Sequence, residues 1–243
     1  MTPLVFLHGF NGSPNTWDHV VSHLSPELES IRPTIGGHGL LPAPQTFEGE
    51  VDRLATLIAE LGRPAHVCGY SLGGRLAIGL VARHAKLVRR LTLVGANVGL
   101  STEMDRRTRA EQDDTWAAMI ERQGVAAFIE RWEAQPLFAT QLQLPEKVRA
   151  EQHSQRLGHD AQRLGGAMRA LSLGRMPYYA DALASVDSPI TLVSGELDLK
   201  FTDVARRLLP TLRHGRHHVV DGAGHNVVLE RPAALAALLL ERS

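Results

Sequence analysis

Ser71, in the pentapeptide Gly-Tyr-Ser-Leu-Gly over residues 69–73, is the residue of this chain best placed to do chemistry. The pentapeptide follows the apolar run 65–68 and precedes a helical pattern over 75–83. A G-x-S-x-G sequence between a strand and a helix is typical of a nucleophile elbow, a sharp turn that lifts a serine hydroxyl out of a sheet. Glycines at both ends of the pentapeptide leave room for such a turn. The pattern alone is weak, so the prediction depends on its partners.

Two later loops carry the residues that would activate Ser71. A serine hydroxyl is a poor nucleophile or base at neutral pH unless an imidazole takes its proton and a carboxylate orients that imidazole. Asp198 follows the strand-like run 190–193, and His225 follows the strand-like run 217–220. This order of serine, acid and histidine is the order found in α/β-hydrolases. We therefore predict a catalytic triad of Ser71, Asp198 and His225.

Alternatives exist for each member of this triad. Glu196 and Asp221 are also acids near the ends of predicted strands, and Asp198 is preferred because it lies further out on its loop. Taken singly, Ser71 would suit a helix N-cap, Asp198 a turn, and His225 an exposed position. The prediction rests on their occurring together, each on a loop at the same end of a strand.

The loop after the first strand-like run, 4–7, is expected to present the backbone N–H of Phe10 near Ser71. Together with the N–H of Leu72, it would form an oxyanion hole. In such a hole, two fixed donors stabilise negative charge that develops on a substrate oxygen.

No motif of the chain indicates a cofactor. His214, His217 and His218 are close in sequence, but adjacent residues of a strand point to opposite faces, and no cysteine or carboxylate pattern completes a ligand set. His38, which lies between two glycines, is expected to shape a loop. Because the chain also has no G-x-G-x-x-G or P-loop sequence, we expect neither a metal nor a nucleotide cofactor.

Composition and charge exclude several classes of protein. The chain has 243 residues and a formal net charge of zero, so its overall charge does not indicate a nucleic acid or an anionic membrane as partner. No apolar run reaches the length that spans a membrane. The one cysteine, Cys68, cannot form an internal disulfide, and its place in a predicted strand indicates a small buried hydrophobe. We expect a soluble, cytoplasmic protein.

Strand-like and helix-like segments alternate along most of the chain. The helical segment 47–61 has apolar residues at three-four spacing, while a weaker strand over 30–35 is interrupted by Pro33. The clearer strand-like runs are 4–7, 65–68, 90–94, 190–193 and 217–220. This alternation predicts an α/β protein with the α/β-hydrolase fold, a mostly parallel sheet flanked by helices.

The alternation stops after residue 98. From there to residue 186 the chain has no strand-like run, and its amphipathic segments are 116–122, 125–132, 147–157 and 161–171. We predict a core of residues 1–98 and 187–243, with a helical cap of residues 99–186 inserted between core strands. A cap over the triad would enclose a substrate and exclude water. The alternative is that these helices only cover apolar surface.

Several arginines are placed where they would meet an anionic substrate. Arg75 follows Ser71 by one turn of the predicted elbow helix, Arg106 and Arg109 open the first cap helix, and Arg156 lies beyond the middle of the cap. Guanidinium groups bind carboxylates by two-point contacts. Because most basic residues of the chain are arginines, composition is the competing explanation for each one singly.

Five blocks of sequence carry a resemblance to a known family. They are residues 5–12, 69–75, 132–138, 195–201 and 223–226. The first and last blocks are shared by many α/β-hydrolases, whereas Arg75 after the elbow glycines, the Trp-x-x-Gln-Pro-x-Phe block and Lys200-Phe201 are more specific. Together they resemble the 2-succinyl-6-hydroxy-2,4-cyclohexadiene-1-carboxylate synthases, lyases of menaquinone biosynthesis with the α/β-hydrolase fold.

The resemblance extends from the first strand to the last block and implies roles for particular residues. It implies the same triad, Ser71, Asp198 and His225. It also implies that substrate carboxylates contact Arg75, Arg109 and Arg156, and that the pocket is lined by Tyr70, Trp132 and Phe138. Periodicity alone would place Trp132 and Phe138 in an ordinary cap core. The match is loosest around Arg156.

The resemblance further implies the reaction. It is the elimination of pyruvate from 2-succinyl-5-enolpyruvyl-6-hydroxy-3-cyclohexene-1-carboxylate, a small substrate whose three carboxylates suit converging arginines. A triad of this kind also supports other chemistry. The alternatives are a serine hydrolase that acts on esters or carbon–carbon bonds, and a non-catalytic protein that uses the pocket as a receptor.

Overall fold

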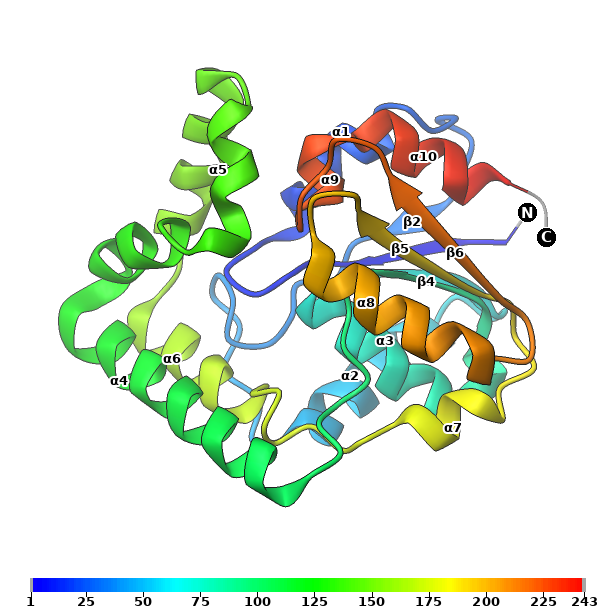
Figure 1. Cartoon of the computed structure of the whole chain (residues 1–243), viewed down its shortest axis with the longest axis horizontal. Coiled ribbons are helices and arrows are strands. Elements are labelled where there is room, and N and C mark those ends of the chain that lie inside the picture. The colour runs from blue at the N-terminus through cyan, green and yellow to red at the C-terminus, as the bar shows by residue number, and fades with distance from the viewer. Residues whose placement is uncertain (1, 242–243) are drawn as a thin grey trace.

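The computed structural model describes residues 2–241, and its centre is a six-stranded sheet in the order β2-β1-β3-β4-β5-β6 (Figure 1). Every neighbouring pair of strands is parallel. The strands are β1 (Leu4–Leu7), β2 (Ser30–Ile31), β3 (Ala65–Tyr70), β4 (Val88–Val94), β5 (Ile190–Gly195) and β6 (Gly215–Val220). The predicted α/β fold with a mostly parallel sheet is confirmed.

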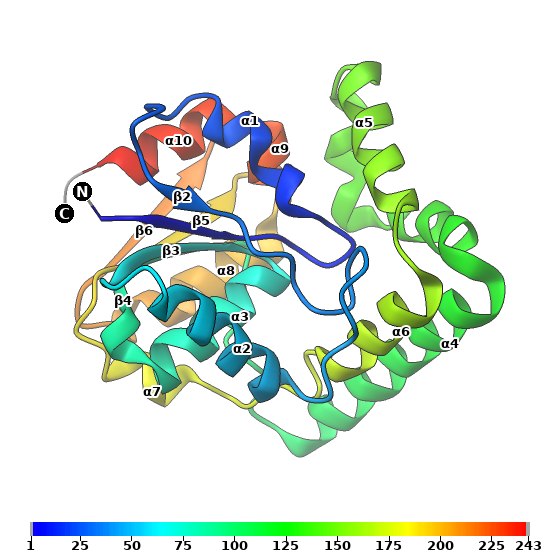
Figure 2. The same ribbon diagram turned by 180° about the vertical axis from the view of Figure 1, so that it is seen from behind.

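Helices cover both faces of this sheet, as the two opposite views show (Figures 1 and 2). One face carries α1 (Asp18–Val21), α9 (Val227–Glu230) and α10 (Pro232–Leu240). The other face carries α2 (Phe47–Ala59), α3 (Leu72–Arg83), α7 (Ala180–Ala184) and α8 (Leu199–Leu208). Short 3₁₀ helices occupy Pro14–Trp17, Ala85–Leu87, Pro136–Gln143 and Leu209–Thr211.

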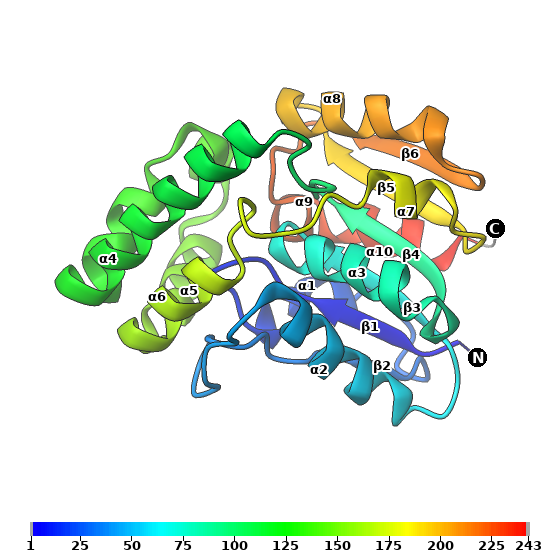
Figure 3. The same ribbon diagram turned by 90° about the horizontal axis from the view of Figure 1, so that it is seen from below.

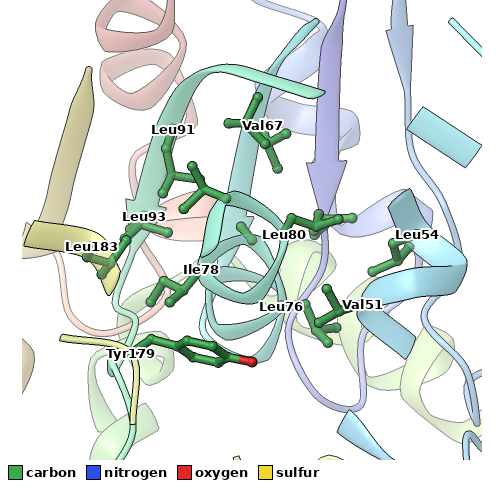
Figure 4. Packing of buried hydrophobic residues seen from close by; sticks show 14 of the residues in the cluster. Val51, Leu54, Val67, Leu76, Ile78, Leu80, Leu91, Leu93, Tyr179 and Leu183 are labelled. Atoms are coloured by element: carbon green, nitrogen blue, oxygen red, sulfur yellow. The ribbon is translucent and has the colours of Figure 1, made fainter. Parts of the chain in front are cut away.

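The core is divided by the sheet into two apolar layers. Because helices lie on both faces, all residues of β1 and β3 are buried, which explains why these strands are continuous apolar runs rather than alternating ones. In the larger layer, Leu76 of α3 lies beside Val51 of α2, and Ile78 lies toward Tyr179 (Figure 4). Helix α3, which begins directly after Ser71, is therefore anchored along its length.

Two elements are shorter than their sequence patterns predict. The strand expected over 30–35 is limited to Ser30–Ile31, because Pro33 has no N–H to donate to a sheet. The helix expected over 47–61 ends at Ala59, and Gly62 follows with a φ of 66° that few other residues adopt.

Between β4 and β5 the chain forms helices beside the carboxyl ends of the strands (Figures 1 and 3). They are α4 (Glu103–Glu133), α5 (Glu146–Leu157) and α6 (Ala161–Ala170). The two segments predicted over 116–122 and 125–132 are halves of α4, separated at Gly124, which has non-helical φ and ψ of 85° and 168°. Helices α4 and α6 bury a cluster of their own that includes Phe128 and Leu164.

The division into a core and a cap at residues 99 and 186 stays a prediction. Leu183 of α7, inside the predicted cap range, packs in the large core layer together with Met176 and Tyr179. No helix within residues 2–241 combines the length and the hydropathy that a membrane crossing requires.

Candidate active site

Ser71 occupies a strained turn between β3 and α3. Its φ and ψ of 51° and −107° lie in a region that residues other than glycine rarely adopt. The turn is held by hydrogen bonds from Ser71 N–H to the Val94 carbonyl (2.9 Å) and from Arg75 N–H to the Ser71 carbonyl (3.0 Å). A Cβ on Gly73 would overlap the carbonyl of Leu7. The close approach of α3 to β1 therefore requires a glycine there, and the turn has the geometry of a nucleophile elbow.

His225 connects Ser71 to Asp198. Its Nδ1 lies 2.7 Å from Asp198 Oδ2, and its Nε2 lies 3.3 Å from Ser71 Oγ. Because an ionised carboxylate only accepts hydrogen bonds, Nδ1 carries the proton and Nε2 is free to accept the hydroxyl proton of Ser71. The side chains of His225 and Asp198 are 1% and 3% exposed, so solvent does not compete for this contact.

Asp198 is also the N-cap of α8. Its Oδ1 accepts a hydrogen bond from Phe201 N–H at 3.3 Å, and the positive end of the helix stabilises the carboxylate charge. The alternative acids are placed differently. Glu196 accepts from the N–H of Gly222 at 2.8 Å, and among the described residues the acid that contacts His225 is Asp198.

Close packing holds the imidazole of His225 in place. The ring of Phe201 lies 4.5 Å from it and the ring of Tyr70 5.4 Å, measured between centroids. On another side, a Cβ added to Gly95, which has a φ of 57°, would lie 2.9 Å from His225 Cε1. A residue with a side chain at position 95 would therefore displace the imidazole.

Sequence reasoning missed Glu230, a buried acid that holds the loop carrying His225. Its Oε2 accepts from the N–H of Gly224 at 2.7 Å, and its Oε1 accepts from the N–H of Asn226 at 3.2 Å and from Thr140 Oγ1 at 3.1 Å. One carboxylate thus binds the backbone on both sides of the histidine. A glutamate in a short helical segment looks like a surface residue, and only the three-dimensional arrangement reveals its contacts.

Ser71 and His225 line a cavity of about 240 Å³. It is the larger of two cavities described here that reach Ser71, and we call it the larger cavity. Of the predicted site residues, this cavity also contains Phe10, Leu72, Arg75, Arg109, Trp132 and Phe138. It is also lined by polar residues that sequence reasoning did not assign to substrate, namely Asn97, Gln112, Asp113, Gln135, Ser172 and Lys200. Residues from the sheet side and from the helices between β4 and β5 therefore share one cavity.

Arg75 and Arg109 contribute two cationic groups to the larger cavity. Arg75 Nη1 donates to the carbonyl of Leu171 at 2.7 Å, and Arg109 Nε donates to both oxygens of Asp113 at 2.9 and 3.0 Å. Burial, with a smaller contribution from the charge of Arg109, lowers the pKa of Arg75 to about 9. Within residues 2–241 no carboxylate forms an ion pair with Arg75. The two groups therefore favour an anion between or beside them.

Arg156 lines a smaller cavity of about 50 Å³ that also reaches Ser71 and Tyr70 and adjoins the larger cavity at Ser71. Its side chain is 9% exposed and forms an ion pair with Glu133 at 2.7 Å. Its guanidinium also lies 5.8 Å from the ring centroid of Phe138. The structure thus brings Arg156 near the serine, but apart from the other two arginines and with its charge partly neutralised.

The aromatic residues of the site belong to one cluster. The ring of Trp132 lies 5.7 Å from Phe10, 5.2 Å from Phe128 and 5.8 Å from Phe138. Trp132 and Phe138 line both cavities as well. Trp132 and Phe138 therefore do both: they pack in the aromatic cluster and they line the cavities.

Two other histidines that the sequence singles out, His38 and His217, bind protein groups. His38 Nε2 accepts from the N–H of Asn11 at 3.1 Å, so this residue ties two loops together. His217 Nε2 lies 2.9 Å from Ser194 Oγ. Within the described residues, no three His, Cys, Asp or Glu side chains are grouped as ligands for a metal ion.

Known proteins share this sequence pattern and architecture. A model of the family described as "Alpha/beta hydrolase family" matches residues 4–238. The 2-succinyl-6-hydroxy-2,4-cyclohexadiene-1-carboxylate synthase of Enterobacter sp. (strain 638) is 33% identical, with 98% of this chain and 90% of the relative covered. The enzyme of the same name from Yersinia enterocolitica is 32% identical, with 98% and 85% covered.

Solved structures have the same fold. MenH from S. aureus superposes with a TM-score of 0.94 at 24% identity, covering 98% of this chain and 92% of that protein. A thermophilic esterase from Thermogutta terrifontis gives a TM-score of 0.85 at 19% identity, covering 98% and 88%. At these identities the solved structures show the fold alone, whereas the two sequence relatives named above are synthases. The chain belongs to the α/β-hydrolase family and, within it, to the 2-succinyl-6-hydroxy-2,4-cyclohexadiene-1-carboxylate synthases.

Proposed function

We propose that this chain is a lyase that eliminates pyruvate from 2-succinyl-5-enolpyruvyl-6-hydroxy-3-cyclohexene-1-carboxylate. The product is 2-succinyl-6-hydroxy-2,4-cyclohexadiene-1-carboxylate. One observation carries the proposal: the contact of Ser71 with His225 opens into the same cavity as Arg75 and Arg109. A base and two carboxylate-binding groups thus face one enclosed space, which is what proton abstraction from a polyanionic substrate needs.

Ser71, His225 and Asp198 form the catalytic triad of this reaction. Ser71 removes a proton from the ring carbon next to the succinyl ketone while its own hydroxyl proton passes to His225 Nε2. Asp198, bound to Nδ1 at 2.7 Å, stabilises the imidazolium that forms. The pair of electrons left by the proton moves toward the ketone and then expels the enolpyruvyl oxygen from the ring.

The backbone N–H groups of Phe10 and Leu72 form the oxyanion hole and stabilise charge on the ketone oxygen. Both residues line the larger cavity next to Ser71. The departing enolate takes up the proton held by His225 on its carbon and leaves as pyruvate. This transfer returns His225 to its neutral form. Water is not a reactant, and the helices α4 to α6 over the cavity keep it out.

The substrate is held as a polycarboxylate. Arg75 and Arg109 bind carboxylates in the larger cavity, and Arg156 binds in the smaller one, while Tyr70, Trp132 and Phe138 pack against the ring and side arms. This positioning places the proton, rather than a carbonyl carbon, in front of Ser71, which selects elimination over acyl transfer. Residues 99–186 act as the cap, and the reaction requires no metal or organic cofactor.

The setting is the cytoplasm, with a small molecule as the partner and neither nucleic acid nor membrane involved. The one cysteine, Cys68, is buried and free, which suits a reducing compartment. Burial raises the pKa of its thiol, so it is not a reactive group.

The test is a coupled assay for pyruvate with the enolpyruvyl substrate. We expect the wild-type protein to release pyruvate, and the Ser71→Ala and His225→Ala variants to be slower by roughly 10³-fold or more. Ser22→Ala, at an exposed serine outside both cavities, is the matched control and should keep wild-type activity. Near-native pyruvate release by Ser71→Ala would show that the mechanism is wrong. Rapid turnover of p-nitrophenyl acetate without pyruvate release would instead identify a serine hydrolase.

A further inference from the structure

One short segment after α6 holds both guanidinium groups of the larger cavity. The carbonyl of Leu171 accepts from Arg75 Nη1 at 2.7 Å. The next residue, Ser172, donates from Oγ to Asp113 Oδ2 at 2.7 Å, and Asp113 in turn accepts from Arg109 Nε. Two arginines on different helices, α3 and α4, are thus linked through consecutive residues of a third element.

Asp113 engages only one edge of Arg109. Both carboxylate oxygens lie within 3.0 Å of Nε, and neither amino group, Nη1 nor Nη2, has an acceptor among the described residues. The Asp113 side chain is 5% exposed and the Arg109 side chain 35%. A guanidinium is a planar fork of donors, so fixing its Nε edge also fixes the direction in which its amino groups point.

Ser172 is itself held rigidly. It is 1% exposed, and its Oγ accepts a hydrogen bond from the N–H of Gly174 at 3.0 Å, which leaves the hydroxyl proton for Asp113. A Cβ on Gly174 would lie 2.5 Å from the backbone nitrogen of Ala110. The segment therefore packs against the backbone of α4 between Arg109 and Asp113, the residues it supports.

We infer that Asp113 and Ser172 are positioning residues, which orient Arg109 so that its amino groups and those of Arg75 receive one carboxylate of the substrate. This inference rests on the proposed function, because it takes the substrate to be a polycarboxylate. Neither residue reacts with the substrate, and both act through Arg109.

The charges of the three side chains support this arrangement. Burial and, to a smaller extent, repulsion from Arg109 lower the pKa of Arg75, whereas the charge of Asp113 acts in the opposite direction. Among these three groups, two cations and one anion leave one net positive charge, which a single substrate carboxylate would balance. Lys200, which lines the same cavity, is a further cation. Asp113 therefore stabilises the two arginines in the absence of substrate and still leaves a positive site.

The first test is Asp113→Asn, which keeps the shape of the side chain and removes its charge. We expect KM to rise about tenfold, because a charge-assisted hydrogen bond to Arg109 is replaced by a neutral one, while kcat stays within about threefold. Asp203→Asn is the control. It neutralises an exposed aspartate that, like Asp113, pairs with an arginine one helical turn away, and it should leave both constants unchanged.

The same substitution in the Arg109→Ala variant distinguishes a positioning role of Asp113 from general support of the fold. In Arg109→Ala, Asp113 is a buried charge that has lost its arginine and repels the substrate. Adding Asp113→Asn to that variant should therefore lower KM, the reverse of its effect in the wild-type protein. A residue that merely supports the fold would raise KM in both backgrounds, and that result would overturn the inference.

Ser172→Ala keeps the inference testable if Asp113→Asn does not fold. It removes one hydroxyl and should raise KM by roughly threefold with kcat unchanged, provided that urea unfolding shows a folded protein. Wild-type protein that releases no pyruvate would contradict the proposed function. Wild-type protein that releases pyruvate, with KM unchanged in folded Asp113→Asn or Ser172→Ala, would contradict this inference alone.

Discussion

At the scale of single residues, the site depends on positions where no side chain fits. Gly95 borders the imidazole of His225 so closely that a Cβ would lie 2.9 Å from Cε1. The contact between His225 Nε2 and Ser71 Oγ is 3.3 Å, and proton transfer weakens steeply when such a distance grows. The absence of a Cβ atom at position 95 is thus part of the proposed catalytic geometry.

Gly95→Ala should lower kcat by about 10²-fold, because the added methyl group pushes the imidazole away from Ser71. Gly62→Ala is a matched control. Gly62 has a similar φ of 66°, but nothing lies within 4 Å of a Cβ there. The positive φ should cost both variants about 1 kcal/mol of unfolding free energy. Gly95→Ala should lose more, because its methyl group also meets the imidazole, and only Gly95→Ala should lose activity in the pyruvate assay. Equal activity of the two variants would contradict the role given to Gly95.

Arg75→Ala should raise KM by at least about tenfold while leaving the fold intact, because a partly buried guanidinium that binds a carboxylate directly is lost. Steady-state kinetics measure KM, and circular dichroism checks the fold. Arg213→Ala, at an arginine whose exposed side chain pairs with Asp187, is the control and should behave like wild type. An unchanged KM in Arg75→Ala would remove Arg75 from the substrate site.

At the scale of elements, loops at the carboxyl ends of parallel strands bring the site together, and each loop is fixed by the helix that comes after it. Asp198 is positioned because it caps α8, and Ser71 because α3 begins at the next residue. The loop with His225 is fixed by Glu230 of α9, which also binds Thr140 in the segment between α4 and α5. This carboxylate connects the histidine loop to the helices that cover the cavity.

Glu230→Gln should lower kcat about tenfold. An amide keeps one acceptor oxygen but turns N–H donors toward the N–H groups of Gly224 or Asn226, which loosens the loop around His225. Glu196→Gln is the matched control, since Glu196 also accepts a loop N–H, that of Gly222, without bracketing the histidine. The pyruvate assay should separate the two variants, and equal rates would show that Glu230 does not hold the loop.

At the scale of the whole molecule, buried neutral histidines link stability to pH. Burial lowers the pKa of His8 to about 4 and that of His66 to about 3, from an ordinary value of 6.5. Below pH 6.5 the unfolded chain takes up protons that the folded chain excludes. The stability these residues contribute is therefore complete above pH 6.5 and is lost as the pH falls toward 4.

The free energy of unfolding should be lower at pH 5 than at pH 7, by about 2 kcal/mol for each of these two histidines. Urea unfolding followed by circular dichroism at the two pH values measures the difference. His66→Gln should reduce the pH dependence by about 2 kcal/mol, because glutamine does not titrate. A wild-type stability that is the same at both pH values would show that protons reach these imidazoles in the folded state.

Features of the protein that depend on local patterns could be predicted from its amino-acid sequence. The alternation of strand-like and helix-like runs specified the parallel sheet, because side-chain periodicity decides which elements can be buried on both faces. The G-x-S-x-G pentapeptide marked the elbow at Ser71, because only glycine fits the close approach of α3 to β1. Loops at the ends of successive strands marked Asp198 and His225.

Features that depend on distances between segments far apart in the chain became apparent from the folded structure. It brought Asp198, rather than Glu196, to His225, and it placed Arg156 on the smaller of two adjoining cavities and Arg109 on the larger. It also revealed Glu230, Asp113 and Ser172, which no periodicity distinguishes from surface residues. Hydrogen bonds act over about 3 Å, and sequence spacing does not measure such distances once a chain of this length folds back on itself.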